Sequence, residues 1–189
     1  MADGTLKVGT ITTSSGSGTI TLGQSGETVD MANGTITLNS AMKNTPAFEA
    51  SLSSNQAFSS GTAVKVQFSS ETFDSDNCYD NSTNYRFTPT TAGKYYVYAT
   101  IYAYQDTNNT NQVSVVYIYK NGSRQQSNRL YFPQNPAQAM YVTISGIYDM
   151  NGSSDYLEIY GESTGDAGDF IVVNSNKNNL FGAYKLIGT

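Results

Sequence analysis

The chain has 189 residues, a formal net charge of −5, only 13% charged side chains and no histidine. This acidic balance, without runs of Lys or Arg, argues against nucleic-acid binding, which needs cations to neutralise phosphates. The lack of histidine excludes Ser-His-Asp triads and His-containing zinc sites within the chain. The single cysteine, Cys78, excludes an intramolecular disulfide, and we interpret it as a structural thiol.

The composition is polar but weakly charged, with 15 Tyr and no Trp, which is typical of all-β proteins rich in turns. No apolar run approaches the roughly 20 residues of a membrane-spanning helix, so membrane insertion is not expected. The first ten residues, MADGTLKVGT, lack the basic start and apolar core of a signal peptide. We therefore expect the protein to be assembled in a cytoplasm.

Residues 1–43 repeat the tetrapeptide Gly-Thr-Ile-Thr, at Gly9–Thr12, Gly18–Thr21 and Gly34–Thr37. Each copy is too short to close its own core, so such segments pack against copies of themselves or against neighbouring chains. This pattern predicts a β-rich stalk or an extended arm. A flexible Gly/Ser linker is the alternative, although the β-branched residues argue against it. We divide the chain into this region and a domain of residues 44–189.

The domain alternates short strand patterns with turns. The expected strands are Ala47–Leu52, Thr62–Phe68, Asn84–Phe87, Lys94–Gln105, Val113–Lys120, Arg129–Phe132, Ala139–Tyr148, Asp155–Tyr160, Phe170–Val173 and Leu180–Ile187. Asn121-Gly122 predicts a type I′ hairpin turn, in which both central residues need positive φ. About ten short strands without a helical segment predict an antiparallel jelly-roll β-sandwich.

The segment Lys94–Gln105 is the strongest strand pattern, and its two faces differ. One parity is aliphatic apart from a first tyrosine and suits a core: Tyr95, Val97, Ala99, Ile101 and Ala103. The other parity carries four tyrosines: Tyr96, Tyr98, Tyr102 and Tyr104. Because side chains alternate across a strand, these tyrosines form one outer face. That face has more aromatic surface than a solvated strand normally shows.

Several motifs, taken together and in order, resemble the C1q/TNF-like superfamily of trimeric jelly rolls. They are Pro46-Ala47-Phe48, Val64–Phe68, Asn84–Pro89 followed by Ala92–Val97, Ile118–Gly122, Asp155–Ile159 and Phe181–Tyr184. The sequence departs from the family at Val97, where Phe is usual, and at Ala183, where Gly is usual. The resemblance covers residues 46–189 and implies a homotrimer in which one sheet of each subunit faces the threefold axis.

The first 43 residues resemble repeats in structural proteins of tailed phages, particularly marine ones. Combined with a trimeric head and no collagen repeat, this resemblance predicts a virion protein: a fibre, an appendage or a capsid decoration. Residues 1–43 would attach to other virion proteins, and loops of the head would contact a host-surface glycan or protein, with weak contacts adding through multivalency. The alternative is a bacterial carbohydrate-binding or surface-coat protein of the same fold.

Six tyrosines are the candidates for the trimer interface, because buried aromatic rings contribute strongly to association. They are Tyr96, Tyr98, Tyr102, Tyr104, Tyr156 and Tyr160. The last two have the parity opposite to Leu157 and Ile159, so we expect them beside the others. A tyrosine-lined glycan groove is the alternative use of this surface. Phe181 and Tyr184 fall on opposite parities, which leaves the register of the last strand open.

Three aspartates in one loop, Asp74, Asp76 and Asp80, are candidates for a Ca²⁺ site, because hard cations prefer carboxylate oxygens. Their spacing is not that of an EF-hand, and a solvated acidic turn is the alternative. Asp166 and Asp169 are equally ambiguous. We therefore expect no cofactor other than, at most, calcium.

Glu158 and Glu162 are the conceivable carboxylate pair for glycoside hydrolysis, but nothing in the sequence marks a cleft, so we expect no enzyme. Four polar segments of uneven length are candidates for partner recognition. They are Ser69–Thr83, Asp106–Asn111, Ser123–Ala137 and Glu162–Asp169.

Overall fold

The computed structural model of the protein describes residues 11, 25–26, 28–29, 35–38, 42–104, 111–165, 170–172 and 178–188. The chain forms two units, Met1–Thr37 and Leu38–Thr189, and every strand of the described residues lies in the second. The stalk expected for residues 1–43 falls largely outside the described residues. None of the described residues forms a helix that is long and apolar enough to cross a membrane.

The second unit is built from strands. They are β1 (Ala47–Ser51), β2 (Gln56–Phe58), β3 (Val64–Lys65), β4 (Ser70–Asp74), β5 (Tyr79–Asp80), β6 (Arg86–Phe87), β7 (Ala92–Tyr104), β8 (Asn111–Lys120), β9 (Ser123–Tyr131), β10 (Ala139–Asn151), β11 (Leu157–Gly165), β12 (Phe170–Val172) and β13 (Leu180–Lys185).

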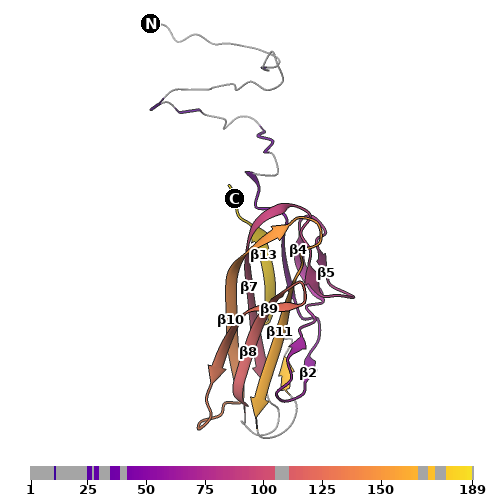
Figure 1. Cartoon of the computed structure of the whole chain (residues 1–189), viewed down its shortest axis with the longest axis vertical. Coiled ribbons are helices and arrows are strands. Elements are labelled where there is room, and N and C mark those ends of the chain that lie inside the picture. The colour runs from indigo at the N-terminus through magenta and orange to yellow at the C-terminus, as the bar shows by residue number, and fades with distance from the viewer. Residues whose placement is uncertain are drawn as a thin grey trace. The chain divides into compact units, whose positions relative to one another are not determined.

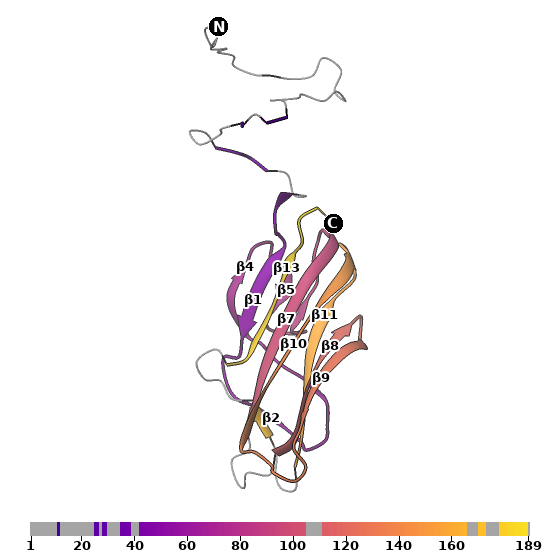
Figure 2. The same ribbon diagram turned by 90° about the vertical axis from the view of Figure 1, so that its left-hand side faces the viewer.

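These strands form two antiparallel sheets (Figures 1 and 2). In the first sheet, β7 pairs with β10 on one side and with β13 on the other, and β13 continues through β1 to β4; β12 and β2 extend the far end of β7. The second sheet runs β5-β6-β11-β8-β9, with β3 also pairing with β11. The predicted antiparallel jelly-roll sandwich is confirmed.

The core lies between the sheets and is aromatic at its centre. The inward side chains of β7 from Tyr95 to Ala103 are all buried, as their parity predicted. Phe48 of β1 stacks on Tyr79 and Phe87 of the second sheet, at centroid distances of 4.5 and 4.6 Å. It also meets Phe181 of β13 edge-on at 4.8 Å. This cluster therefore joins the two sheets.

Side-chain amides join two edge strands, β9 of the second sheet and β10 of the first. Gln126 of β9 donates to the Ser145 carbonyl of β10 at 3.0 Å, and Asn128 donates to the Thr143 carbonyl at 2.7 Å. Among the described strands, β10 pairs with β7 alone. These two amides therefore link the second sheet to the outermost strand of the first.

Two segments expected to be recognition loops contain strands. The segment 69–83 includes β4 and β5, and β9 occupies most of the segment 123–137. Both β4 and β9 are edge strands with few buried side chains, so their residues do not alternate between apolar and polar. Their positions in the sheets come from backbone pairing with β1 and β8. The segment from Glu162 to Gly165 likewise belongs to β11, and residues 105–110 and 166–169 lie outside the described ranges.

The Asn121-Gly122 turn has φ values of 53° and 75°, as the type I′ prediction requires. After β10, Gly152 has a φ of 72°, and a Cβ there would lie 2.3 Å from the Ala92 backbone nitrogen. Only glycine fits this close approach.

Candidate functional site

The outer surface of the first sheet gathers six tyrosines from three strands. We call it the tyrosine face, and its tyrosines are Tyr96, Tyr98, Tyr102, Tyr104, Tyr141 and Tyr184. The register explains the grouping: Tyr102 is opposite Tyr141 of β10, and Tyr96 is opposite Tyr184 of β13. The four tyrosines expected to share one face of the central strand do so, because their neighbours of the other parity are buried in the core.

Tyr98 is fixed at the centre of this face by a glycine. Its partner across the β7–β13 pair is Gly182, where a Cβ would lie 2.4 Å from the Tyr98 ring and hydroxyl. The ring therefore covers the space that a side chain would fill. Its hydroxyl donates a hydrogen bond to Glu49 Oε2 at 2.9 Å. Burial, and then this hydrogen bond to a carboxylate, raise the pKa of Tyr98 well above the usual range, so the phenol stays neutral.

The other rings of the face form pairs across strands. Tyr102 and Tyr141 are stacked with centroids 4.3 Å apart, and Tyr96 and Tyr184 lie at 5.5 Å. Each such pair contributes about 0.2–1 kcal/mol to the stability of the sheet. Tyr141 nevertheless keeps 53% of its surface exposed, and Ile147 keeps 59%. The face is thus ordered by its own contacts but remains open to solvent.

The tyrosine face is almost uncharged. Along β7 and β10, the outer positions from Tyr96 to Tyr104 and from Ala139 to Ile147 carry no charged residue. The ion pair between Lys94 and Asp149, at 2.6 Å, marks one end of this stretch. Depletion of charge together with enrichment of exposed aromatic side chains characterises the central part of protein–protein interfaces.

Tyr156 and Tyr160 do not belong to this face. The expectation that they lie beside the β7 tyrosines is wrong, because β11 pairs with β8 in the second sheet. There Tyr160 stacks on Tyr119 at 4.2 Å, and Arg86 lies over the Tyr156 ring at 4.4 Å. The six tyrosines proposed from the sequence therefore occupy two opposite surfaces.

Sequence reasoning missed two members of the tyrosine face. Tyr141 could have been found, because Met140, Val142 and Ile144 share the opposite parity and are buried. Tyr184 could not, since only the pairing of β13 with β7 and β1 shows that Phe181 points into the core and Tyr184 outward.

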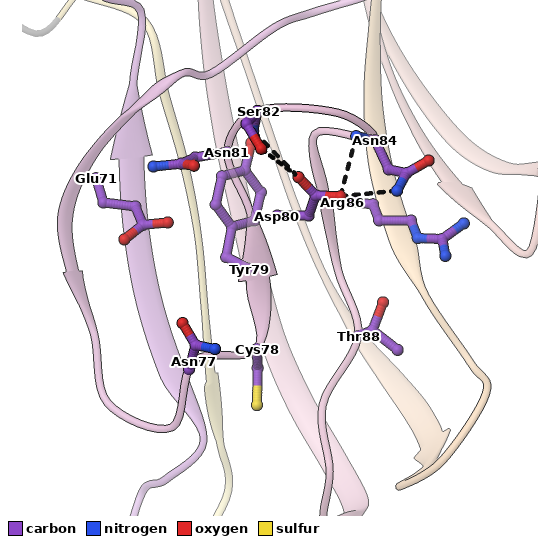
Figure 3. Close-up of a pocket in the computed structure, with 10 residues that line it drawn as sticks. All are labelled: Glu71, Asn77, Cys78, Tyr79, Asp80, Asn81, Ser82, Asn84, Arg86 and Thr88. Atoms are coloured by element: carbon purple, nitrogen blue, oxygen red, sulfur yellow. Dashed lines mark hydrogen bonds between the residues drawn. The ribbon is translucent and has the colours of Figure 1, made fainter.

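The three aspartates considered for calcium lie in and around β4 and β5 and act as acceptors for their own loop. Asp80 borders an open depression of about 700 Å³ (Figure 3). Its carboxylate accepts backbone N–H bonds from Ser82, Thr83 and Asn84 at 2.9–3.1 Å. These bonds, that of Thr83 above all, hold the pKa of Asp80 far below its usual value.

The other two aspartates are used in the same way. Asp74 accepts the Tyr79 N–H at 2.7 Å, and Asp76 accepts the Ser75 hydroxyl at 2.5 Å. The described residues contain no group of three or more His, Cys, Asp or Glu side chains that could hold a metal ion. In this structure the three carboxylates therefore serve as hydrogen-bond acceptors for their own loop, and the calcium site stays a prediction. Asp166 and Asp169 lie outside the described residues.

The carboxylates Glu158 and Glu162 are each bound by a neighbour on the outer side of the second sheet. Glu158 forms an ion pair with Lys65, and Glu162 accepts the Tyr117 hydroxyl at 2.5 Å. Burial and this hydrogen bond raise the pKa of Tyr117 to about 12. Four residues along one strand separate the two carboxylates by about 13 Å, which exceeds the separations used by retaining and inverting glycosidases.

Comparison with solved structures identifies the fold. The chain is similar to the globular domain of zebrafish complement 1qA protein, at 12% identity and a TM-score of 0.53, over 75% of this chain and 97% of that one. It is also similar to murine APRIL, at 9% identity and a TM-score of 0.55, over 74% and 98% of the two chains.

A third similar structure is the Eiger TNF of S. frugiperda, at 14% identity and a TM-score of 0.53, over 74% of this chain and 91% of that one. No protein-family model matches the chain, and no curated protein sequence matches it. The second unit is thus a C1q/TNF-like jelly roll by fold, and identities this low establish the fold alone.

Proposed function

We propose that the jelly roll is the head of a non-enzymatic homotrimer in which three tyrosine faces pack around the threefold axis. The observation that carries this proposal is the exposed, uncharged aromatic surface of β7 and β10. Burying such a face removes apolar area from water and leaves no unpaired charge buried, so association is favourable. Glu49, the carboxylate nearest the rings, already accepts a hydrogen bond from Tyr98.

The trimer would serve as a virion structural protein of a tailed phage, as a fibre, an appendage or a decoration. This part of the proposal rests on the Gly-Thr-Ile-Thr repeats of residues 1–43, which would attach the head to other virion proteins. Three heads on one attachment would present the same surfaces three times, so weak contacts with a host surface add through multivalency. Assembly would take place in the host cytoplasm.

Sedimentation equilibrium tests the trimer. The purified chain is expected to have three times the 20.4 kDa mass of one chain, whereas a monomer at micromolar concentration would contradict the proposal. Tyr102→Ala removes one ring of the stacked pair with Tyr141 and should weaken association. Tyr119→Ala is the matched control, because it removes one ring of a similar stacked pair on the second sheet. If Tyr102→Ala changes only saccharide binding, the glycan-groove alternative holds.

The virion role has its own test. Antibodies against the jelly roll should label purified particles, and a particle reconstruction should place the chain at a threefold site or on a fibre. Absence of the chain from purified particles would contradict the virion role, and labelling of bacterial cells by the same antibodies would favour the surface-coat alternative.

A further inference from the structure

The outer face of the second sheet carries every arginine of the chain. We call it the arginine face, and it comprises Arg86, Arg124, Arg129, Tyr117, Tyr119 and Tyr160. Arg129 is opposite Val115 and Arg124 is opposite Tyr119, both outward positions of β8. On β6, Arg86 precedes the core residue Phe87, so the Arg86 side chain points outward like the other two. It lies at the edge of the depression in Figure 3. Three arginines on one sheet face contrast with the net charge of −5.

Each of these guanidinium groups lies over a tyrosine ring. Arg86 lies 4.4 Å from the ring centroid of Tyr156, Arg124 lies 5.5 Å from that of Tyr117, and Arg129 lies 4.8 Å from that of Tyr131. Stacking on a ring holds the plane of the guanidinium in place while its edge keeps N–H donors for a ligand. The aromatic rings therefore preorganise the three cations.

No carboxylate of the described residues forms an ion pair with these arginines. The ion pairs formed by side chains of the described residues all use lysine: Lys65 with Glu158, Lys94 with Asp149, and Lys120 with Asp155. Of the acidic side chains between the arginines, Glu158 pairs with Lys65, and Glu162 accepts a hydrogen bond from the neutral Tyr117 hydroxyl. The three guanidinium groups thus form no ion pair among the described residues, and their N–H donors remain available to a ligand.

The spacing of the arginines excludes a single small anion as their common ligand. The β8 partners of Arg124 and Arg129 are four residues apart, which corresponds to about 13 Å along the sheet. Between the cations lies an aromatic platform, in which Tyr119 stacks on Tyr160 at 4.2 Å and meets Tyr117 at 6.3 Å. A ligand that spans this face must alternate anionic groups with flat, weakly polar segments.

We infer that the arginine face binds an anionic polysaccharide, with its carboxylate or sulfate groups on Arg86, Arg124 and Arg129 and its sugar rings over Tyr119 and Tyr160. Planar guanidinium groups bind such oxyanions through paired N–H donors. Single-stranded nucleic acid is the competing polyanion, and the test below separates the two by competition. The inference names a partner class for the adhesive role proposed above and rests on that role for its biological meaning.

Affinity electrophoresis through polygalacturonate, dextran sulfate and neutral dextran tests this site at several salt concentrations. The wild-type chain should be retarded by polygalacturonate or dextran sulfate but not by dextran, and the preferred polymer shows whether carboxylate or sulfate is the group recognised. Arg124→Gln combined with Arg129→Gln should weaken this binding at least tenfold. Lys43→Gln combined with Lys94→Gln is the control, because it removes two exposed positive charges away from the arginine face and should leave binding nearly unchanged.

Tyr119→Ala separates a built site from simple charge attraction. It keeps all three arginines and should still weaken polysaccharide binding severalfold, because the stacked platform is lost. The inference is overturned if neither anionic polymer binds, if the two double variants bind equally, or if single-stranded DNA competes as well as the polysaccharide. Sedimentation of the same samples reports the trimer independently, so loss of one property is distinguished from loss of the other.

Discussion

Tyr98 of β7 lies directly over Gly182 of β13, and the absence of a side chain at position 182 lets the Tyr98 hydroxyl reach Glu49 on the next strand. Three strands are thereby joined on the outer face of the sheet by one ring and one hydrogen bond. Gly182 is therefore a structural requirement of the tyrosine face.

Gly182→Ala should destabilise the domain by about 1–3 kcal/mol, the usual cost of forcing extra volume into a packed site. The methyl group must displace the Tyr98 ring, because the two would lie 2.4 Å apart. Urea unfolding measures the loss, and the cycle with Tyr98→Ala provides the control. In the Tyr98→Ala background the Gly182→Ala change should be nearly neutral; an unchanged cost would show that the ring is not the obstacle.

Thr143→Lys should convert the proposed trimer to monomers without unfolding the chain. Thr143 is exposed on β10 and shares a hydrogen bond of 3.0 Å with Thr100 at the centre of the tyrosine face. A lysine there is solvated in the monomer but would bury a charge between subunits, which is costly without a partner. Sedimentation velocity measures the effect. Ser127→Lys, at an exposed position of β9, is the control and should remain trimeric.

Asp80→Asn should lower stability at neutral pH, and the difference from the wild type should shrink in acid. The folded loop depresses the pKa of Asp80, so its carboxylate stabilises the fold at pH values above the unfolded value of about 3.9. That contribution is lost as the pH falls below this value towards the folded pKa. Urea unfolding from pH 7 to pH 2.5 should therefore give converging curves. Parallel curves would contradict this role for Asp80.

Phe48→Ala should cost about 3–5 kcal/mol, the range for deleting a buried aromatic side chain. Phe48 is fully buried and contacts aromatic rings from both sheets. Thermal unfolding measures the loss. Phe132→Ala removes a ring that is 46% exposed, and a surface change of this kind should stay within about 0.5 kcal/mol. Similar losses for both variants would contradict the assignment of the core.

The sequence predicted those parts of the fold in which burial imposes a period. Alternation identified the inward and outward faces of β7, and the Asn121-Gly122 pair identified a turn that needs two positive φ values. It missed β4 and all but the last three residues of β9, because edge strands that bury few side chains leave no period to detect. Backbone hydrogen bonds to neighbouring strands determine where β4 and β9 lie, and the residue types of β4 and β9 do not directly encode those bonds.

The candidate sites divide in the same way. The face of the β7 tyrosines followed from local parity, whereas the positions of Tyr156 and Tyr160 depended on which sheet receives β11, which is a question of long-range pairing. The arginine face was not predicted at all. Its three arginines come from β6 and β9, strands that are far apart in the sequence and are brought onto one surface by β8 and β11 between them.

The amides of Gln126 and Asn128 have a consequence for how the protein assembles. An outermost strand with free backbone groups is a template on which further chains can add without limit. Because these side chains bind the Ser145 and Thr143 carbonyls of β10, they compete with any incoming strand at that margin. Growth by strand addition is thereby disfavoured at β10, the edge of the sheet that carries the tyrosine face, which suits the closed oligomer of defined size proposed for that face.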